Sequence, residues 1–418
     1  MDAPAAPLDR ALADIAAGAD RLAEDLGHLL AFDTVYPPAR DYAGLVGWAE
    51  ARFGRLGFSC RRVLVPRALW DVPGAGAEGD RVNLIAELPG PDPVAIYSHI
   101  DVVPPGEGWT VPPLAATRRG GEVWGRGAAD MKGTVAATLL AVEAALAHGL
   151  ALRHAPRVLL TTDEEGGAYP GVRYLAEQGL VGDHLICLDG SAAPRVWQGS
   201  FGSLEMQIVI RGRSGHAGQR GSGDNALERA IPVLAALMEL KQHVEQRSSA
   251  LRGQDGAALR PILAVTVMNA GTKANNVPAQ AVIGLNRRYA PEERDEVALA
   301  EIRAAVAGAV PEGTQWELRV TGHLAAVLDA DDGPHWPRWQ AACARAFGWP
   351  PESFRRYGGT GSSDMGWVQR AGLKEIMIGG ASRPDSRVHG ADERVRLADL
   401  QSLAAAILLY LAVDFPPH

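Results

Sequence analysis

The chain has 418 residues, 47% of them hydrophobic and 22% charged, so it is long enough to fill more than one hydrophobic core. Its formal net charge of −8 gives no electrostatic footprint for nucleic-acid binding, which needs a basic face, and the sequence has no run of about 18 apolar residues that could span a membrane. Three cysteines without a CxxC pair argue against a disulfide framework and against a thiolate zinc site. The N-terminus lacks the basic and apolar regions of a signal peptide, so we expect a cytoplasmic protein that binds neither nucleic acid nor membrane.

The N-terminal part of the chain reads as two helices followed by two strands. Apolar residues at helical spacing predict a helix that ends before the prolines at 37 and 38, and a second helix that Gly57 ends. The expected ranges are helices at 8–32 and 42–56, and strands at 58–65 and 82–88.

Three apolar strands further along each end in residues that can carry chemistry. The strand at 93–97 is followed by Ser98, His99 and Asp101, the strand at 157–161 by Thr162-Asp-Glu-Glu, and the strand at 185–188 by Asp189. Helices alternate with these strands, which predicts a parallel sheet covered on both faces. Ligands of such sheets bind outside the carboxyl ends of the strands, so we expect the site there.

The pattern changes between residues 200 and 320. A strand, a helix, two strands, a helix and a strand are expected at about 203–211, 225–245, 262–268, 281–289, 291–309 and 316–320. This is the order of a ferredoxin-like unit. We therefore predict a satellite domain at 200–320, inserted into a catalytic domain formed by 1–199 and 321–418.

Side chains of metal-ligand type recur at the ends of strands and loops: His99, Asp130, Glu165, Asp189 and His389. Two divalent cations about 3.5–4 Å apart need a bridging carboxylate and nitrogen or oxygen ligands on either side. Glu164 is a spare carboxylate beside Glu165. A cation lowers the pKa of its bound water, and a nearby carboxylate accepts the proton, so the two glutamates divide into a ligand and a general base. The carboxylate two residues after His99, that of Asp101, fits the group that orients a ligand imidazole.

Each of these residues also has an ordinary structural interpretation. Asp130 could cap the helix that follows it, and Asp189 could sit in a turn. A single histidine at a strand end is more often structural than a ligand. Five such residues in the same kind of position outweigh these interpretations. Lys132, which lies near this set, is expected to reach the surface.

Three segments resemble signature segments of one family of metallopeptidases, which includes aminoacylase, acetylornithine deacetylase, succinyl-diaminopimelate desuccinylase and carboxypeptidase G. They are SHIDVVP at 98–104, GRGAADMKG at 125–133 and TDEEGG at 162–167. The resemblance extends over nearly the whole chain, from 33–38 to 388–393. It implies a zinc-exopeptidase-like α/β catalytic domain with a mixed, mostly parallel sheet, together with the inserted ferredoxin-like satellite domain.

The resemblance also implies a role for each matching residue. His99, Asp189 and Asp130 would hold one metal ion, and Glu165, His389 and Asp130 the other, with Asp130 as the bridge. Glu164 would be the general base, and Asp101 would orient His99. The two ions would be zinc, with cobalt or manganese as alternatives.

Other implied roles concern the substrate and a second copy of the chain. Members of the family dimerise through the satellite domain, and the residue matching His216 reaches into the partner's site to stabilise the oxyanion. The positions that match substrate contacts are Asn276, Arg288, Gly359, Thr360 and Ser363. Strand alternation lets only one of Arg287 and Arg288 face the site. The loop at 359–364 is two residues longer than the usual Gly-Thr-Ser-Asp, and the proline that often follows the family's histidine is missing after His216, so the substrate stays open.

The sequence therefore predicts a metal-dependent hydrolase that cleaves the amide bond of an N-acyl amino acid or a related small carboxylate-bearing amide. A dipeptidase or glutamate-releasing carboxypeptidase is the alternative, and hydrolysis of another C–N bond, such as that of an aromatic amine, is a more distant one. A nucleotide-dependent oxidoreductase is disfavoured because the glycine-rich stretches at 125–127 and 359–361 have Asp where GxGxxG needs its third glycine. A catalytically inactive binding protein would lack a ligand or the base, and all six positions are filled.

Overall fold

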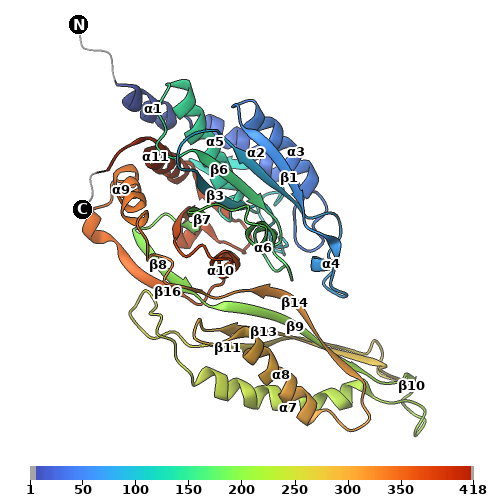
Figure 1. The fold of residues 1–418 in the computed structure, drawn as a ribbon. Helices are drawn as coiled ribbons and strands as arrows, with labels where there is room; N and C mark the ends of the chain where they lie inside the picture. Colours follow the sequence, from blue (N-terminus) through green and yellow to red (C-terminus); the bar gives the residue numbers. More distant parts are fainter. Residues whose placement is uncertain (1–5, 416–418) are drawn as a thin grey trace.

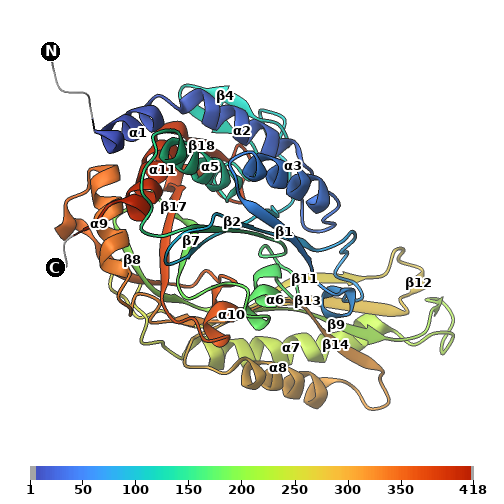
Figure 2. The same cartoon turned by 45° about the horizontal axis from the view of Figure 1, so that its top comes forward.

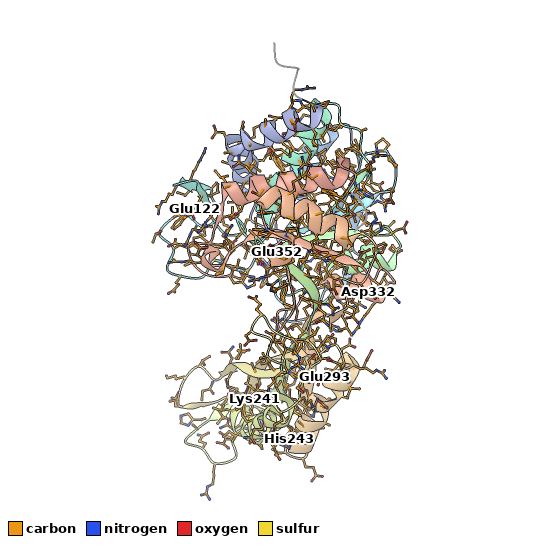
Figure 3. All side chains as sticks on the ribbon, turned by 90° about the vertical axis from the view of Figure 1, so that its left-hand side faces the viewer. Glu122, Lys241, His243, Glu293, Asp332 and Glu352 are labelled. Atoms are coloured by element: carbon orange, nitrogen blue, oxygen red, sulfur yellow. The ribbon has the colours of Figure 1, made fainter. Side chains whose placement is uncertain are left out.

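The computed structural model describes residues 6–415, which form two lobes (Figure 1). The larger lobe contains both ends of the described chain, and the smaller lobe is built from the middle of the sequence. Figure 3 shows the two lobes from the side, with Glu122 and Glu352 in the larger one and Lys241, His243 and Glu293 in the smaller one. None of the described helices is both long enough and apolar enough to cross a membrane.

A six-stranded sheet forms the centre of the larger lobe. Its order is β1 (Ser59–Leu64), β2 (Val82–Glu87), β6 (Pro156–Thr161), β3 (Val94–His99), β7 (Leu185–Ser191) and β17 (Ile376–Ser382). The pairs β6–β3, β3–β7 and β7–β17 are parallel, whereas β1–β2 and β2–β6 are antiparallel. The strands β2, β3 and β6 are almost wholly buried, as apolar strands covered on both faces should be. The prediction of a mixed, mostly parallel sheet is confirmed.

Helices cover both faces of this sheet (Figures 1 and 2). On one side lie α1 (Pro7–Ala16), α2 (Ala19–Ala31), α3 (Tyr42–Gly54), α5 (Lys132–Ala147) and α11 (Leu397–Ala412), with α9 (Trp336–Phe347) beside α11. On the side facing the smaller lobe lie α6 (Gly171–Glu177) and α10 (Met365–Arg370). The helices α5 and α11 are rich in Ala and Leu and buried along most of their length, so they form the centre of the core.

Short elements complete the larger lobe. One small sheet has the order β18 (Arg394–Arg396), β5 (Glu122–Trp124) and β4 (Thr117–Arg119), and another has β15 (Val327–Leu328), β8 (Arg195–Ser200) and β16 (Arg355–Gly359). The remaining helices are α4 (Arg67–Trp70) and the 3-10 turns Pro351–Ser353 and Pro384–Ser386.

The smaller lobe has the expected order of elements. These are β9 (Gly202–Arg211), α7 (Ala226–Glu245), β11 (Ile262–Ala270), β13 (Gln280–Tyr289), α8 (Asp295–Ala309) and β14 (Trp316–Leu324). The strands form an antiparallel sheet in the order β11-β13-β9-β14, and α7 and α8 pack on one face of it (Figure 1). Its buried residues form a hydrophobic cluster separate from that of the larger lobe. This is a ferredoxin-like arrangement. The boundary predicted at residue 320 falls inside β14.

Two helices differ from the sequence expectation. The single helix predicted at 8–32 is two helices, because the chain turns at Ala17 and Gly18 between α1 and α2. A side chain at position 18 would come within 2.8 Å of the Leu140 side chain on α5, so the turn brings the backbone close to that helix. The helix expected from residue 291 begins at Asp295.

A pair of very short strands projects from the smaller lobe. They are β10 (Gly215–His216) and β12 (Asn276–Val277), which pair antiparallel with each other and not with the main sheet. Figure 1 places β10 at the tip of the lobe, far along the sheet from the larger lobe. Residues carried on this pair are therefore presented outward.

Candidate metal centre

Most of the residues expected at the site lie at the carboxyl ends of the parallel strands. His99 ends β3, Glu164 and Glu165 lie in the turn after β6, and Asp189 lies two residues before the end of β7. These strands are neighbours in the sheet, so their ends meet at one edge. Asp130 reaches the same edge just before α5, and His389 comes from the loop between β17 and β18.

Two groups of three ligand-type side chains meet at this edge and share one carboxylate. His99, Asp130 and Asp189 offer atoms within 4.8 Å of one another, and so do Asp130, Glu165 and His389. His99 Nε2 lies 3.1 Å from Asp130 Oδ1, whereas His389 Nε2 lies 3.2 Å from Asp130 Oδ2 and 3.0 Å from Glu165 Oε2. The two oxygens of Asp130 thus face two different imidazoles. This is the arrangement that a bridging carboxylate between two cations requires.

The electrostatics of the cluster show an excess of negative charge. Burial, followed by the nearby Asp130 charge, raises the pKa of Glu165 to about 7 and the pKa of Asp189 well above its usual range. Burial also raises the pKa of Glu164, with Asp189 adding to the effect. Asp130 differs: burial alone would raise its pKa, but hydrogen bonds to His389 and His99 lower it. Carboxylates crowded in this way repel each other unless a cation lies between them.

The donor set fits divalent cations that accept nitrogen and oxygen ligands. Each group of three combines one imidazole with two carboxylates, and neither includes a cysteine. Such a set suits zinc and also manganese or cobalt, and three protein ligands leave a position open for water or substrate. The structure thus supports the sequence-based ligand set, while the assignment of each residue as a ligand stays a prediction.

His99 is held by contacts to Asp101. Its Nδ1 lies 3.1 Å from the backbone oxygen of Asp101 and 3.7 Å from the carboxylate Oδ1, so Nε2 is left to face Asp130. The other carboxylate oxygen of Asp101 accepts a hydrogen bond from the backbone N–H of Glu165. Asp101 therefore connects His99 with the Glu164–Glu165 turn, and most of its contact with the ring is through the backbone.

Glu393 is a buried residue of the site to which sequence reasoning gave no role. Its Oε1 accepts hydrogen bonds from the backbone N–H groups of Gly127, Ala129 and Asp130 at 3.1, 2.9 and 3.0 Å, and its Oε2 pairs with Arg126. The side chain is fully buried. It fixes the backbone of the Asp130 loop from behind, and its position four residues after His389 was the available signal.

An open cleft of about 410 Å³ adjoins the cluster. It is lined from both lobes, among others by Glu164, Glu165, Ser203, Glu205, Arg288, Ser362 and His389. Arg288 Nη1 donates a hydrogen bond to Ser362 Oγ at 2.7 Å. The neighbouring Arg287 instead points away, where it is buried and paired with Glu293. Of the two arginines that competed in the sequence, Arg288 is the one at the cleft.

In the loop after β16, the residues that line the cleft differ from those expected. Gly361 and Ser362 line it, whereas Gly359 and Thr360 are half-buried at the end of β16 and Ser363 is buried. The Ser363 hydroxyl accepts a hydrogen bond from the Met365 N–H at the start of α10. Of the two extra residues of this loop, Ser362 therefore presents its side chain to the cleft and Gly361 its backbone.

His216 and Asn276 do not join the cluster within this chain. They face each other in register on β10 and β12, and both are exposed. Asn276 Oδ1 accepts a hydrogen bond from Ser214, and the ring of His216 accepts one from the Gly218 N–H. Their expected roles would need a second copy of the chain.

The expectation for Lys132 is wrong. It is fully buried, and its ammonium donates hydrogen bonds to the carbonyls of Leu29 and Phe32, each at 3.1 Å. The last carbonyls of a helix have no partner within the helix, and Lys132 supplies one at the end of α2. Burial lowers the pKa of this lysine to about 7.

The fold, the paired ligand groups and the adjoining cleft define a metal-dependent hydrolase. The chain belongs to the peptidase family M20/M25/M40, whose sequence pattern matches residues 95–412.

Individual relatives agree with this. The chain is 31% identical over 398 residues to the succinyl-diaminopimelate desuccinylase of Xylella fastidiosa, covering 86% of this chain and 90% of that protein. Its fold is similar to that of human carnosine dipeptidase 1, with a TM-score of 0.78, 17% identity and coverage of 96% and 99%. The dipeptidase Dug1p of Saccharomyces cerevisiae gives a TM-score of 0.78 at 15% identity, with coverage of 96% and 97%.

Proposed function

We propose that this enzyme hydrolyses the amide bond of an N-acyl amino acid or a related small amide that carries a carboxylate. The observation that supports this most is the pair of ligand groups sharing Asp130, with Glu164 beside them at the cleft. Its relatives at 31–32% identity are named succinyl-diaminopimelate desuccinylases, which favours an acylated amine as substrate.

Two divalent cations are proposed as the cofactor. His99, Asp189 and Asp130 would hold one, and Glu165, His389 and Asp130 the other. Bound there, such ions polarise the scissile carbonyl and lower the pKa of the attacking water. We propose zinc, for which cobalt or manganese could substitute in the same donor set.

Glu164 is proposed as the general base and acid. It is buried at the end of β6, lines the cleft and belongs to neither ligand group, so its carboxylate is free to face a substrate. The carboxylate takes a proton from the water as the new C–O bond forms. It then delivers the proton to the amine nitrogen as the C–N bond breaks, which balances the reaction.

Arg288 is proposed to bind the carboxylate of the substrate. Among residues 6–415 it has no ion pair with an acidic side chain, and its guanidinium donates a hydrogen bond to Ser362. A guanidinium at a cleft without a carboxylate partner is well suited to a charge-assisted contact with a ligand. Burial lowers the pKa of Arg288, and the charges of Glu205 and Glu164 oppose this effect.

We further propose a homodimer formed through the satellite domain. Exposed apolar side chains gather on α7 and the adjacent edge strand β11, namely Leu227, Ile231, Met238, Ile262 and Val267. Covering them would favour association. In such a dimer His216 of one protomer would stabilise the oxyanion in the other, and Asn276 would contact the substrate.

A cytoplasmic location is part of the same proposal. Cys60, Cys187 and Cys343 are all unpaired thiols, as a reducing compartment favours.

A dipeptidase is the second candidate. The cleft holds the carboxylates of Glu164 and Glu205 opposite Arg288, and such a combination could bind the free amino group and the carboxylate of a dipeptide. The solved relatives named as dipeptidases share the fold.

A matched substrate panel tests the proposal. Enzyme stripped with a chelator and reloaded with Zn²⁺ is assayed on N-succinyl and N-acetyl amino acids and on dipeptides with the same C-terminal residue. We expect the acyl amino acids to be hydrolysed, and Glu164→Gln to lose at least about 10³-fold in kcat while keeping its zinc. Loss of zinc in Glu164→Gln would contradict its role as base, and activity on dipeptides alone would select the second candidate.

A further inference from the structure

A second cluster of ligand-type residues lies at the opposite edge of the central sheet. Asp92 precedes β3, His154 precedes β6 and His184 immediately precedes β7. These three strands are neighbours in the order β6-β3-β7 and run parallel, so the residues before them meet at the amino edge of the sheet. The proposed catalytic residues follow the carboxyl ends of the same strands.

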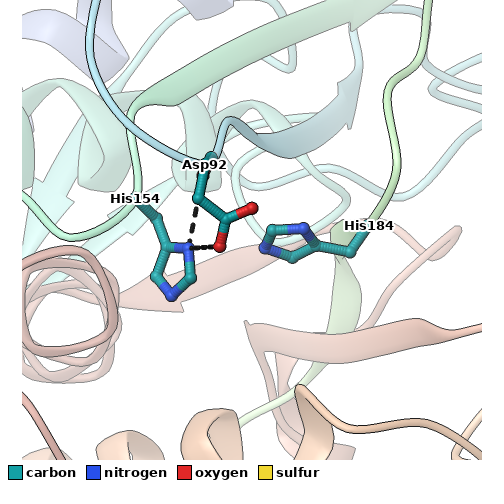
Figure 4. Close-up of side chains that lie close together, drawn as sticks. All are labelled: Asp92, His154 and His184. Carbon is teal, nitrogen blue, oxygen red and sulfur yellow. Dashed lines mark hydrogen bonds and ion pairs between the residues drawn. The ribbon is translucent and has the colours of Figure 1, made fainter.

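The side chains of this amino-edge cluster converge. One ligand atom from each of Asp92, His154 and His184 lies within 4.8 Å of the others. His154 Nδ1 lies 2.8 Å from Asp92 Oδ2 and 3.2 Å from its backbone oxygen. His184 is 1% exposed, and its Nε2 is buried without a hydrogen-bond partner. Figure 4 shows both imidazoles facing the Asp92 carboxylate, and no bond joins His184 to it.

A buried imidazole nitrogen without a partner needs an explanation. Leaving a buried polar group unpaired is unfavourable, because the group has lost its hydrogen bonds to water. A cation bound between Asp92 and the two rings would satisfy His184 Nε2, whereas the His154–Asp92 contact alone does not. This nitrogen is the observation that separates the cluster from an ordinary His–Asp pair.

Packing holds both rings in place. The ring of His335 stacks on His184 at 3.9 Å between centroids, and the ring of Tyr410 stacks on His154 at 5.0 Å. The backbone oxygen of His184 accepts a hydrogen bond from the Ala95 N–H in β3. The ligand atoms are thus preorganised by groups that are not themselves part of the cluster.

Burial disfavours the charged form of both rings, and the neutral imidazole is the form that binds a metal ion. Burial lowers the pKa of His184 to about 4, with contributions from His335 and His154, and burial followed by Arg338 lowers the pKa of His154. The guanidinium of Arg338, whose charge acts on both rings, is held by the Tyr410 carbonyl. Asp92 supplies a negative charge and is partly exposed, which leaves the cluster open to water.

We propose that Asp92, His154 and His184 bind a divalent transition-metal ion, with Zn²⁺ as the preferred ion and water in the remaining position. Two imidazoles and one carboxylate are a donor set that zinc accepts. The ion would connect the segments before three adjacent strands and stabilise this edge of the sheet. The site is independent of the catalytic centre and of the substrate proposed above.

Zinc counting on full-length variants tests this site. Asp92→Asn removes the charge while keeping a side chain that tolerates the left-handed backbone at this position, where φ is 38°. His184→Gln removes the unpartnered nitrogen. The matched control is His148→Gln, because His148 also lies near an aspartate, 3.6 Å from Asp14, but belongs to no group of three within residues 6–415.

Each protein is stripped with a chelator and titrated with Zn²⁺ alone, with the bound metal counted and competed against a chromophoric chelator. We expect three Zn²⁺ per chain in the wild type and in His148→Gln, and two in Asp92→Asn and His184→Gln, which should keep their hydrolytic rate. Zn²⁺ should also raise the melting temperature less in these two variants than in the wild type.

The result that overturns the proposal is an unchanged zinc count in Asp92→Asn and His184→Gln, which would leave the cluster as a structural His–Asp pair. If His184→Gln does not fold, Asp92→Asn decides alone, because its side chain is largely exposed. Combining His184→Gln with His389→Ala should remove one further ion, which separates this site from the catalytic pair.

Discussion

Glu393 offers a test of how the protein positions its bridging aspartate. Its carboxylate is fully buried, accepts three backbone hydrogen bonds from the Gly127–Asp130 loop and pairs with Arg126. In Glu393→Gln the shape is kept, but the charge is lost and an amide NH₂ must face either Arg126 or the three N–H groups. Donors then oppose donors on at least one side.

The expected cost follows from these contacts. Breaking a buried ion pair by removing one partner costs about 3–5 kcal/mol, and Gln retains part of the hydrogen bonding, so we expect the free energy of unfolding to fall by about 3 kcal/mol. Groups that orient metal ligands typically contribute 10–100-fold in metal affinity. Since Glu393 fixes the backbone of Asp130, its replacement should weaken Zn²⁺ binding by roughly this factor.

Urea unfolding of the metal-free protein and chelator competition for Zn²⁺ measure the two effects separately. The control is Glu50→Gln, the same change in an exposed carboxylate that pairs with Arg62, which should cost less than about 1 kcal/mol and leave zinc affinity unchanged. A Glu393→Gln variant that loses stability but binds zinc as tightly as the wild type would show that Glu393 supports the fold without positioning Asp130. Unchanged stability would refute the reasoning altogether.

Three further changes test the site. His389→Ala should bind one zinc ion fewer at the catalytic centre by elemental analysis, and a full pair would show that another residue is the ligand. His216→Ala should keep its zinc and its dimeric elution in size-exclusion chromatography but turn over at least about 10²-fold more slowly, since a lost oxyanion donor costs this much; normal turnover would make it a loop residue. Arg288→Ala should raise KM for carboxylate substrates by about 30-fold, the ratio that ~2 kcal/mol gives, whereas Arg287→Ala should reduce stability and leave KM unchanged.

The sequence could predict which residues meet at this centre because their placement follows from chain direction. His99, Glu165 and Asp189 each lie at or near the carboxyl end of an apolar strand, and neighbouring parallel strands end at one edge whatever the details of packing. The order of the elements in the satellite domain could likewise be predicted from the sequence, because strands and helices differ in the spacing of their apolar residues.

The structural features that the sequence did not predict depend on contacts between segments far apart in the chain. Nothing around Lys132 indicates that the end of α2 lies above it, so a lysine that supplies a partner to helix carbonyls looked like a surface residue. In the same way, Glu393 could not be linked to the backbone of Asp130, which is separated from it by 263 residues. The turn at Gly18 likewise lies against a distant segment, the side chain of Leu140 on α5.

The amino-edge cluster extends the same physical rule to the other end of the strands. The strands β3 and β6 are buried on both faces, so their polar and charged residues must concentrate where each strand begins or ends. At the carboxyl edge of the sheet, this concentration produces an excess of carboxylates, and the pKa of one of them, Glu165, is raised. At the amino edge it concentrates imidazoles kept neutral by burial around one carboxylate. The two edges therefore differ in charge but share a cause, and zinc counts in the variants of His184 and His389 address each edge separately.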